Sequence, residues 1–252
     1  MGNMRGRYYC ERCAVRETGL CSEVSETAAK ELAPISHHRR IPVGQVIQSE
    51  HLGLGWLAII VSGVVKLVKA QKDGRLQIVG LQYASDFIGH PYASKSSLTA
   101  EATTPLELCC FSRTAFEKLL RNHPSLEQAL YRRALHDLDT AREWMFLLGR
   151  KNAREKLASL LVSISTRING QPSGDADTLA LQFNLPLSRN EIADALGLTI
   201  ETVSRELRNL KIAGAISTTG RRGISVLNPD LLQRLAEGDI DDTLAVSPLT
   251  GL

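Results

Sequence analysis

The spacing of apolar residues changes from a strand pattern to a helix pattern at Ser112, and this change constrains the fold more than any other feature. From about Ile41 to Arg113, short apolar segments are punctuated by glycines, and Asp73-Gly74 predicts a hairpin between Val64–Ala70 and Arg75–Val79. After Ser112, apolar residues recur at helical spacing. We therefore expect an α+β fold, with an N-terminal β-roll of the jelly-roll type followed by helices.

Composition narrows the class of protein. Hydrophobic residues make up 43% of the 252 residues and charged residues 23%, as in ordinary globular proteins. No apolar run approaches the roughly 20 residues of a membrane span, and no apolar stretch of a signal peptide follows the basic N-terminus, so we expect a cytoplasmic protein without a membrane partner. The motifs HExxH, GxSxG and Walker A are missing from the sequence, so we expect no enzyme.

A long helix is predicted over residues 123–150, because Pro124 fits the first turn of a helix. One apolar stripe then has spacings of 4, 3, 4 and 3, the pattern of a two-helix seam. A second stripe, with Leu135, Trp144 and Leu147, faces elsewhere. The pattern leaves two interpretations open: the first stripe packs on the chain's own core, or it meets a second copy. Its residues are Ala134, Leu138, Ala141, Met145 and Leu148.

Two short helices joined by a glycine turn are predicted further along. Ser188 and Glu191 form a capping-box pattern, and Gly197 supplies the turn. Thr199 caps a second helix that ends near Ile212. This is the geometry of a helix-turn-helix, and residues 215–226 read as a small hairpin beside it that can serve as a wing.

The exposed face of the second helix has the chemistry of base readout. Arg205 can present a fork to guanine, Glu201 can accept from cytosine, and Ser204 can bond in either direction. Arg189, Arg208 and the arginines of the wing suit phosphates. The alternative is a plain helical hairpin with a solvated face, and the combination of two caps, turn glycine and wing favours DNA. The predicted contact residues are Arg189, Thr199, Glu201, Thr202, Ser204, Arg205, Arg208, Arg221 and Arg222.

Five cysteines form a further signal. Cys10, Cys13 and Cys21 share a short segment with too few aliphatic residues to build a core, and a reducing cytoplasm disfavours structural disulfides. Cys109 and Cys110 are adjacent in an expected strand, so they point to opposite faces and only one of them can join the N-terminal three. Four thiolates suffice for a 4Fe-4S cluster or a structural zinc ion.

The succession of β-roll, long helix and winged helix-turn-helix resembles the CRP/FNR superfamily of bacterial transcription regulators over residues 25–236. The segments that carry the resemblance are Leu196–Arg205 (LGLTIETVSR), with the E-x-x-S-R pattern of the FNR branch, and Leu147–Leu157 (LLGRKNAREKL). The resemblance implies a homodimer that binds a TTGA-N6-TCAA-type palindrome in double-stranded DNA and contacts RNA polymerase. The implied parts are a cluster-binding segment (1–24), a β-roll sensor domain (25–122), a dimerisation helix (123–150), a winged helix-turn-helix domain (151–236) and a loose tail (237–252).

The cysteine pattern resembles the oxygen-sensing FnrL and FnrN type within that branch. The resemblance implies one 4Fe-4S cluster per subunit, intact without oxygen and degraded by it, so that operator binding is favoured at low oxygen. Counting back from Phe116–Leu119, which resembles the family's first helix after the roll, places the fourth ligand on Cys109 rather than Cys110. The implied ligands are Cys10, Cys13, Cys21 and Cys109. FixK-like, thiol-based and zinc-based regulators without a cluster are the alternatives.

Cyclic nucleotides are not expected as effectors. Members of the superfamily that bind them use a Gly-Glu pair near the phosphate and a following Arg-Ser. The corresponding stretches here, Phe87–Tyr92 and Ser94–Thr99, lack the glutamate and the arginine.

Overall fold

The computed structural model describes residues 10, 12–23, 25–53, 55–93, 95–169 and 181–239. The chain divides into two compact units, and the division falls between Arg142 and Glu143, inside helix α5 (Pro124–Arg150). The helix predicted as a separate segment is therefore shared between the two units. No helix in the described ranges is long and apolar enough to cross a bilayer.

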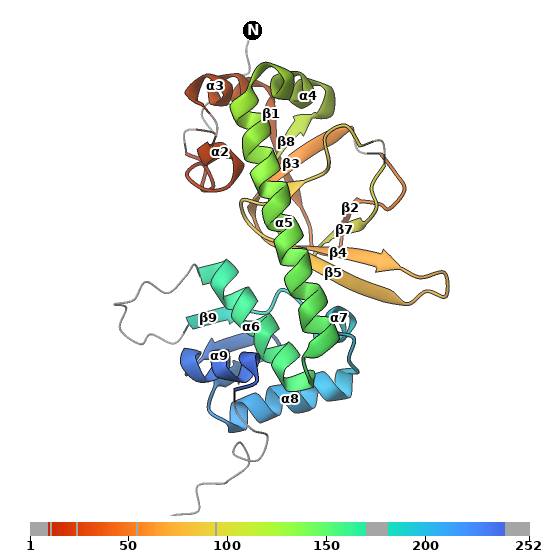
Figure 1. The fold of residues 1–252 in the computed structure, drawn as a ribbon, viewed down its shortest axis with the longest axis vertical. Coiled ribbons are helices and arrows are strands. Elements are labelled where there is room, and N and C mark those ends of the chain that lie inside the picture. The colour runs from red at the N-terminus through yellow and green to blue at the C-terminus, as the bar shows by residue number, and fades with distance from the viewer. Residues whose placement is uncertain are drawn as a thin grey trace, which may run out of the picture. The chain divides into compact units, whose positions relative to one another are not determined.

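The first unit is built on two four-stranded antiparallel sheets (Figure 1). The Asp73-Gly74 hairpin is confirmed between β4 (Val65–Ala70) and β5 (Leu76–Gln82), and Gly74 there has a φ of +87° that favours glycine. Ile60, Leu108 and Cys110 of one sheet pack with Val65 and Ala100 of the other in a core. One sheet has the order β1 (Ser36–Ile41), β8 (Leu106–Ser112), β3 (Trp56–Ser62) and β6 (Phe87–Ile88), and the other has β2 (Val46–Gln48), β7 (Thr99–Ala102), β4 (Val65–Ala70) and β5 (Leu76–Gln82).

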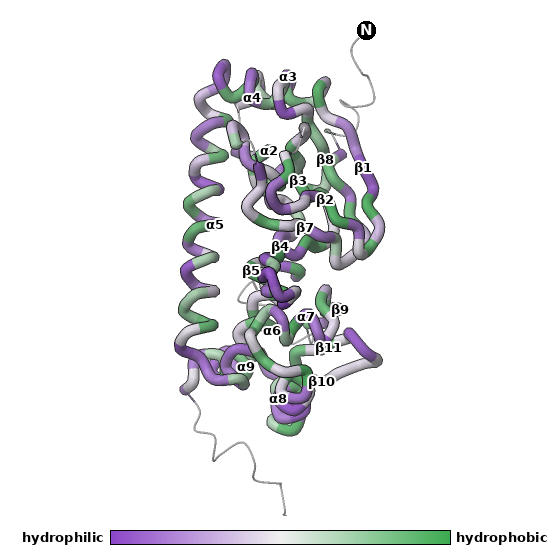
Figure 2. The backbone as a smooth tube through the Cα atoms, turned by 90° about the vertical axis from the view of Figure 1, so that its right-hand side faces the viewer, coloured by the Kyte–Doolittle hydropathy of each residue, from purple (hydrophilic) through white to green (hydrophobic). Residues whose placement is uncertain are grey.

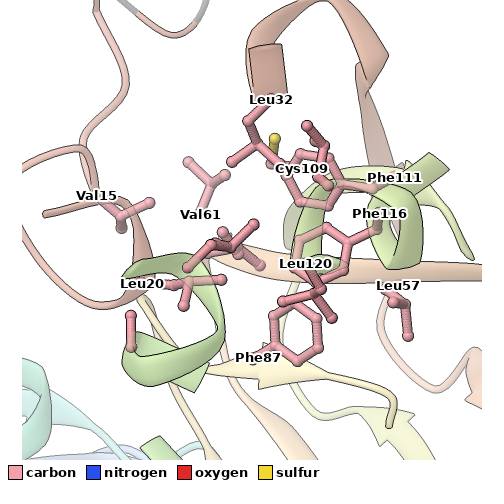
Figure 3. Packing of buried hydrophobic residues seen from close by; sticks show 14 residues of the cluster. Val15, Leu20, Leu32, Leu57, Val61, Phe87, Cys109, Phe111, Phe116 and Leu120 are labelled. Carbon is pink, nitrogen blue, oxygen red and sulfur yellow. The ribbon is translucent and has the colours of Figure 1, made fainter. Parts of the chain in front are cut away.

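Helices and the cysteine segment cover the other face of the β1-β8-β3-β6 sheet. Helices α2 (Leu20–Glu23), α3 (Glu26–Ile35) and α4 (Arg113–Asn122) pack there with the start of α5. Val15 and Leu20 are buried in this second core, which Figure 3 shows. The N-terminal segment, which lacks enough aliphatic residues for a core of its own, is therefore anchored in the core of the β-roll.

Local details of these helices differ from the sequence prediction. Helix α3, capped by Ser25, was not predicted. Helix α4 begins at Arg113, and the hydroxyl of Ser112 before it makes no capping bond to the backbone but pairs with the Thr114 hydroxyl at 3.0 Å.

Helix α5 includes Gly149 and ends at Arg150, as the predicted range of 123–150 implies. The chain leaves the helix there, because the Asn152 side chain accepts from the backbone N–H groups of Arg154 and Glu155 and so caps the next helix, α6 (Ala153–Asn169). Apolar and polar residues alternate along α5 (Figure 2). Of its predicted seam residues, Leu138 is 46% exposed and Met145 73% exposed.

The second unit is a winged helix-turn-helix, which confirms the predicted fold class. The Ser188 capping box is present, and Gly197 ends the first helix with a φ of +63°. Strand β9 and helix α9 were not predicted, and most of the predicted tail at 237–252 lies outside the described residues. After α6 come β9 (Leu181–Asn184), α7 (Arg189–Leu196), α8 (Ile200–Ile212), β10 (Ile216–Thr219), β11 (Gly223–Val226) and α9 (Pro229–Glu237), with sheet order β10-β11-β9.

Candidate functional site

Four of the five cysteines line one cavity of about 400 Å³ in the first unit. They are Cys10, Cys13, Cys21 and Cys109, the same four that the sequence analysis grouped. Cys21 lies on α2 and Cys109 on β8, so distant parts of the chain meet there. Apolar side chains form much of the remaining wall, among them Val15, Leu32, Ile59 and Phe111.

The strand register explains why Cys109 and not Cys110 reaches the cavity. Neighbouring residues on a strand point to opposite faces. Cys109 is 7% exposed and lies among the apolar side chains of the helix-covered face, where Figure 3 shows its sulfur. Cys110 is fully buried between the two sheets with Ala58 and Ile60.

The protonation of these thiols follows from their burial. Burial raises the pKa of Cys21 to about 12, and the neighbouring Cys13 and Cys10 add to the shift. Burial also raises the pKa of Cys109 well above its usual range, again with a contribution from the other three cysteines. Without a cation in the cavity, both thiols are protonated at neutral pH. Reactive cysteines depend on a lowered pKa, and burial shifts the pKa of these two thiols in the opposite direction.

The four cysteines that line the cavity can be compared with the ligand geometry of a cluster and of a single ion. Four sulfurs around one zinc ion each lie about 2.3 Å from a common point. In a 4Fe-4S cluster each thiolate has its own iron, so the sulfurs surround a volume instead. Among the described residues, no three His, Cys, Asp or Glu side chains are placed to hold one metal ion, and the four cysteines line one cavity. Four thiols along one cavity are a donor set that fits a 4Fe-4S cluster.

Ser36 is a polar neighbour of the cavity that the sequence analysis missed. It is buried at the start of β1, its hydroxyl lies 4.0 Å from the Cys10 sulfur, and it donates to the Ala33 carbonyl at 2.8 Å. The pairing of Ser36 with Phe111 on β8 sets this position. Nothing in the local sequence signals the contact, because it depends on the pairing of strands far apart in the chain.

Two contacts join the cysteine segment to the rest of the unit. Two residues after Cys21, the carboxylate of Glu23 accepts from Arg132 Nε of α5 at 2.8 Å. The hydroxyl of Thr18 bonds that of Ser85 at 2.6 Å, and Gly19 packs so tightly there that an added Cβ would lie 2.6 Å from the Ser85 carbonyl oxygen. The segment therefore contacts α5 directly and also the turn before β6.

The same turn is tied to α5 by a buried ion pair. Asp86, adjacent to Ser85, pairs with Arg133, and both side chains are largely buried. Arg133 Nε also lies 3.2 Å from Asp137 one turn further along α5. Burial raises the pKa of Asp137, and the positive charge of Arg133 opposes that shift. A continuous set of polar contacts thus runs from Thr18 through the turn to α5.

In the second unit, α8 presents most of the predicted DNA-contacting residues. Val203, Leu207 and Leu210 are buried, whereas Glu201, Arg205 and Arg208 are exposed and Thr202 and Ser204 are half-buried. The exposed Thr199 caps the helix by accepting from Thr202 N at 3.2 Å. Hydrogen bonds from its own backbone N–H and from Thr199 lower the pKa of Glu201, as expected at a helix N-terminus.

Neighbouring elements bring the other predicted residues to α8. Arg189, at the start of α7, donates to the Ser204 hydroxyl at 3.2 Å, so it lies against the recognition helix. Arg221 and Arg222 are exposed in the β10–β11 turn, where Gly220 has a φ of +60°. The Arg222 carbonyl accepts from Leu185 N at 2.8 Å, which ties the wing to the segment before α7. A capped recognition helix beside a basic wing defines a DNA-binding protein of the winged helix-turn-helix class.

Comparison with known proteins gives the family. The family model described as "Crp-like helix-turn-helix domain" matches residues 155–235, and "Cyclic nucleotide-binding domain" matches residues 38–123. A "Probable transcriptional activator" of Rhizobium leguminosarum bv. viciae is 42% identical over 90% of this chain and 92% of its own length. "Transcriptional activator protein FnrL" of Cereibacter sphaeroides is 38% identical over 94% of this chain and 95% of its own length. The chain belongs to the CRP/FNR family of transcription regulators.

A solved structure of a FixK protein is similar to this chain in fold. FixK2 of Bradyrhizobium japonicum is similar with a TM-score of 0.71 and 29% sequence identity, over 80% of this chain and 97% of that chain. "Nitrogen fixation regulation protein FixK" of Bradyrhizobium diazoefficiens is 34% identical over 91% of this chain and 94% of its own length. The relatives named here are transcription regulators, in keeping with the expectation that the chain is not an enzyme.

Proposed function

We propose that this chain is an oxygen-responsive transcriptional regulator that holds one 4Fe-4S cluster per subunit and binds a TTGA-N6-TCAA-type palindrome as a homodimer at low oxygen. The observation that carries the proposal is the cavity lined by Cys109 of β8 and by the three cysteines of a segment that is joined to α5. The likeness to FnrL supports it. The relatives named as activators favour activation through contact with RNA polymerase, and the missing glutamate and arginine after Phe87 argue against a cyclic-nucleotide effector.

Cys10, Cys13, Cys21 and Cys109 hold the cluster in this proposal. When bound, the cluster supplies an oxygen-labile link between the N-terminal segment and β8. Contacts between the N-terminal segment and the rest of the first unit connect that link to α5. With the segment held, Glu23 stays against Arg132 and Thr18 stays against Ser85, next to the Asp86–Arg133 pair. Loss of the link weakens these contacts. The fraction of molecules whose α5 is arranged for dimerisation then falls.

The exposed seam of α5 is the proposed dimer contact. Leu138 and Met145 are apolar side chains exposed to solvent in the single chain. Burying such a stripe against a second copy stabilises a dimer by removing apolar area from water. A dimer presents two copies of α8 to the two halves of a palindrome.

Iron and acid-labile sulfide content of protein purified without air tests the proposal. We expect about four of each per chain, and a brown colour that fades on exposure to air. The likeness to FixK favours a second candidate, a regulator of the same fold without a cluster. Colourless protein without iron would support that candidate, and stoichiometric zinc would support the zinc-based alternative.

Base readout by α8 can be separated from phosphate binding. We expect Arg205→Ala to relax the preference for one guanine of each half-site, because a bidentate arginine–guanine contact gives about 1–3 kcal/mol of discrimination. Arg222→Ala should weaken binding to all sequences and lower the slope of log affinity against log salt by about one unit. Titrations of operator and random duplexes at several salt concentrations measure both effects. If Arg205→Ala reduced the affinity for the operator and the random duplex equally, Arg205 would have no role in base readout.

The Glu23–Arg132 contact is expected to couple the cysteine segment to the dimer. Both side chains are partly exposed, so the pair contributes at most about 1 kcal/mol. We expect Glu23→Gln to retain the cluster but to reduce, by up to about fivefold, the factor by which the cluster strengthens dimerisation. Sedimentation of loaded and cluster-free protein gives that factor. Glu17→Gln, an exposed carboxylate on the same segment, is the matched control, and an unchanged factor in Glu23→Gln would rule out the coupling role.

A further inference from the structure

Recognition helix α8 contains a carboxylate that faces the protein interior. Glu206 is 7% exposed, although its neighbour Arg205 lies on the exposed face of the same helix. A buried carboxylate is costly unless it is paired and hydrogen-bonded. A leucine at this position would extend the buried apolar stripe of Val203, Leu207 and Leu210, so the glutamate calls for a physical reason.

Three polar side chains surround the Glu206 carboxylate. Its Oε2 accepts from Asn209 Nδ2 at 3.0 Å and lies 3.6 Å from Nε of Arg154 on α6. Its Oε1 accepts from Nε of Arg205 at 3.2 Å. Arg154 is largely buried, whereas the Arg205 side chain is 61% exposed. One carboxylate therefore joins an arginine of the supporting helix to an arginine of the DNA-facing surface.

Glu206 binds the Nε nitrogen of Arg205, and this choice of nitrogen affects how Arg205 can bind a guanine. A guanidinium carries five N–H donors in a rigid planar fork, and a guanine is read by two of them at its O6 and N7 atoms. Glu206 engages the Nε hydrogen of Arg205, and a guanine would be read by N–H groups of the terminal nitrogens Nη1 and Nη2. A long side chain that is already held in one orientation loses less conformational freedom when it meets the base.

We propose that Glu206 is a positioning residue that orients Arg205 for guanine readout and restrains it from turning to a phosphate. The inference rests on the proposed role of Arg205 in base recognition. The negative charge of Glu206 also opposes the approach of phosphate, so it lowers the affinity for DNA of any sequence. Loss of Glu206 should therefore weaken operator binding and leave binding to random DNA equal or stronger. A loss of structure gives a different result, because it weakens binding to the operator and to random DNA alike.

The test compares two duplexes that differ at one guanine. The full-length protein, purified without air, is titrated with a TTGA-N6-TCAA duplex and with one in which the guanine of one TTGA half-site is replaced, with its partner, by an A–T pair. The ratio of the two dissociation constants measures guanine preference. A fraction of unfolded protein changes both constants equally and leaves the ratio unchanged. The variants are Glu206→Gln, Glu206→Leu, Arg205→Ala and, as a matched exposed carboxylate, Asp230→Asn.

We expect Glu206→Leu to reduce the ratio by about tenfold, within the range that a bidentate arginine contact supplies. Glu206→Gln should fall between this variant and the original chain, because an amide oxygen still accepts from Arg205 Nε. Asp230→Asn should match the original chain. If Arg205→Ala abolishes the preference while both Glu206 variants keep it, the positioning role is wrong. If Arg205→Ala keeps the preference, the proposed role of Arg205 fails, and the inference fails with it.

Discussion

Cys109→Ser is expected to abolish the iron–sulfur absorbance of protein purified without air, whereas Cys110→Ser should retain it. The two residues are neighbours in sequence and chemically identical, but only Cys109 lines the cavity with the three N-terminal cysteines. Removal of one of four thiolates leaves an iron without its protein ligand. Cys10→Ser, Cys13→Ser and Cys21→Ser should behave like Cys109→Ser.

Iron content, sulfide content and the visible spectrum measure this difference, and far-ultraviolet circular dichroism checks the fold. A buried hydroxyl without a partner costs about 1–3 kcal/mol, so Cys110→Ser should lower the thermal midpoint through its position between the sheets. Cys110→Ala avoids that hydroxyl and serves as a second control. Loss of the spectrum in both Cys110 variants together with its retention in Cys109→Ser would reverse the assignment.

Leu138→Glu is expected to convert the protein to a monomer and to abolish operator binding at concentrations where the original chain is saturated. In a symmetric dimer the new carboxylate faces its own copy, and two like charges in an apolar seam must both be desolvated. The cysteines lie on other elements, so the cluster should still assemble. The side chain of Leu138 is already 46% exposed in the single chain, so the substitution should cost little in folding.

Sedimentation under nitrogen distinguishes the two interpretations of the stripe. His136→Glu introduces the same charge on the opposite side of α5 and should leave the dimer intact. A Leu138→Glu protein that remains dimeric and binds its operator would place the dimer contact elsewhere.

Sequence patterns over a few residues correctly predicted the turns and helix caps, because these depend on interactions between neighbouring residues. The Asp73-Gly74 hairpin, the Ser188 capping box and the Gly197 turn each depend on residues within a few positions of one another, and all three are present. Alternation along β8 also predicted that Cys109 and Cys110 face opposite sides. Which of them faces the cavity depends on the helices that cover one sheet, so the sequence alone could offer only a resemblance.

The contacts that connect the candidate site to the rest of the protein were not predictable. Thr18 and Ser85 are separated by 67 residues, and Asp86 and Arg133 by 47. Such pairs leave no periodic signal, because their spacing is set by the assembled fold. Strand β9 and helix α9 were missed because each is short and is stabilised by its packing in the second unit. Glu206 was not predictable for a different reason. Helical periodicity predicts an apolar residue on the buried side of α8, but Glu206, which lies there, is charged.

The anchoring of Val15 and Leu20 has a consequence for repair. Each side chain is buried in the core of the β-roll, and burial of such a side chain contributes about 1.5–3 kcal/mol whether or not the neighbouring cysteines bind anything. If the proposed cluster is lost to oxygen, these anchors would keep the cysteine segment close to Cys109. Under the proposed function, rebuilding would then begin from a nearly assembled set of ligands, and its rate would be set by brief local opening that admits iron and sulfide rather than by refolding of the domain.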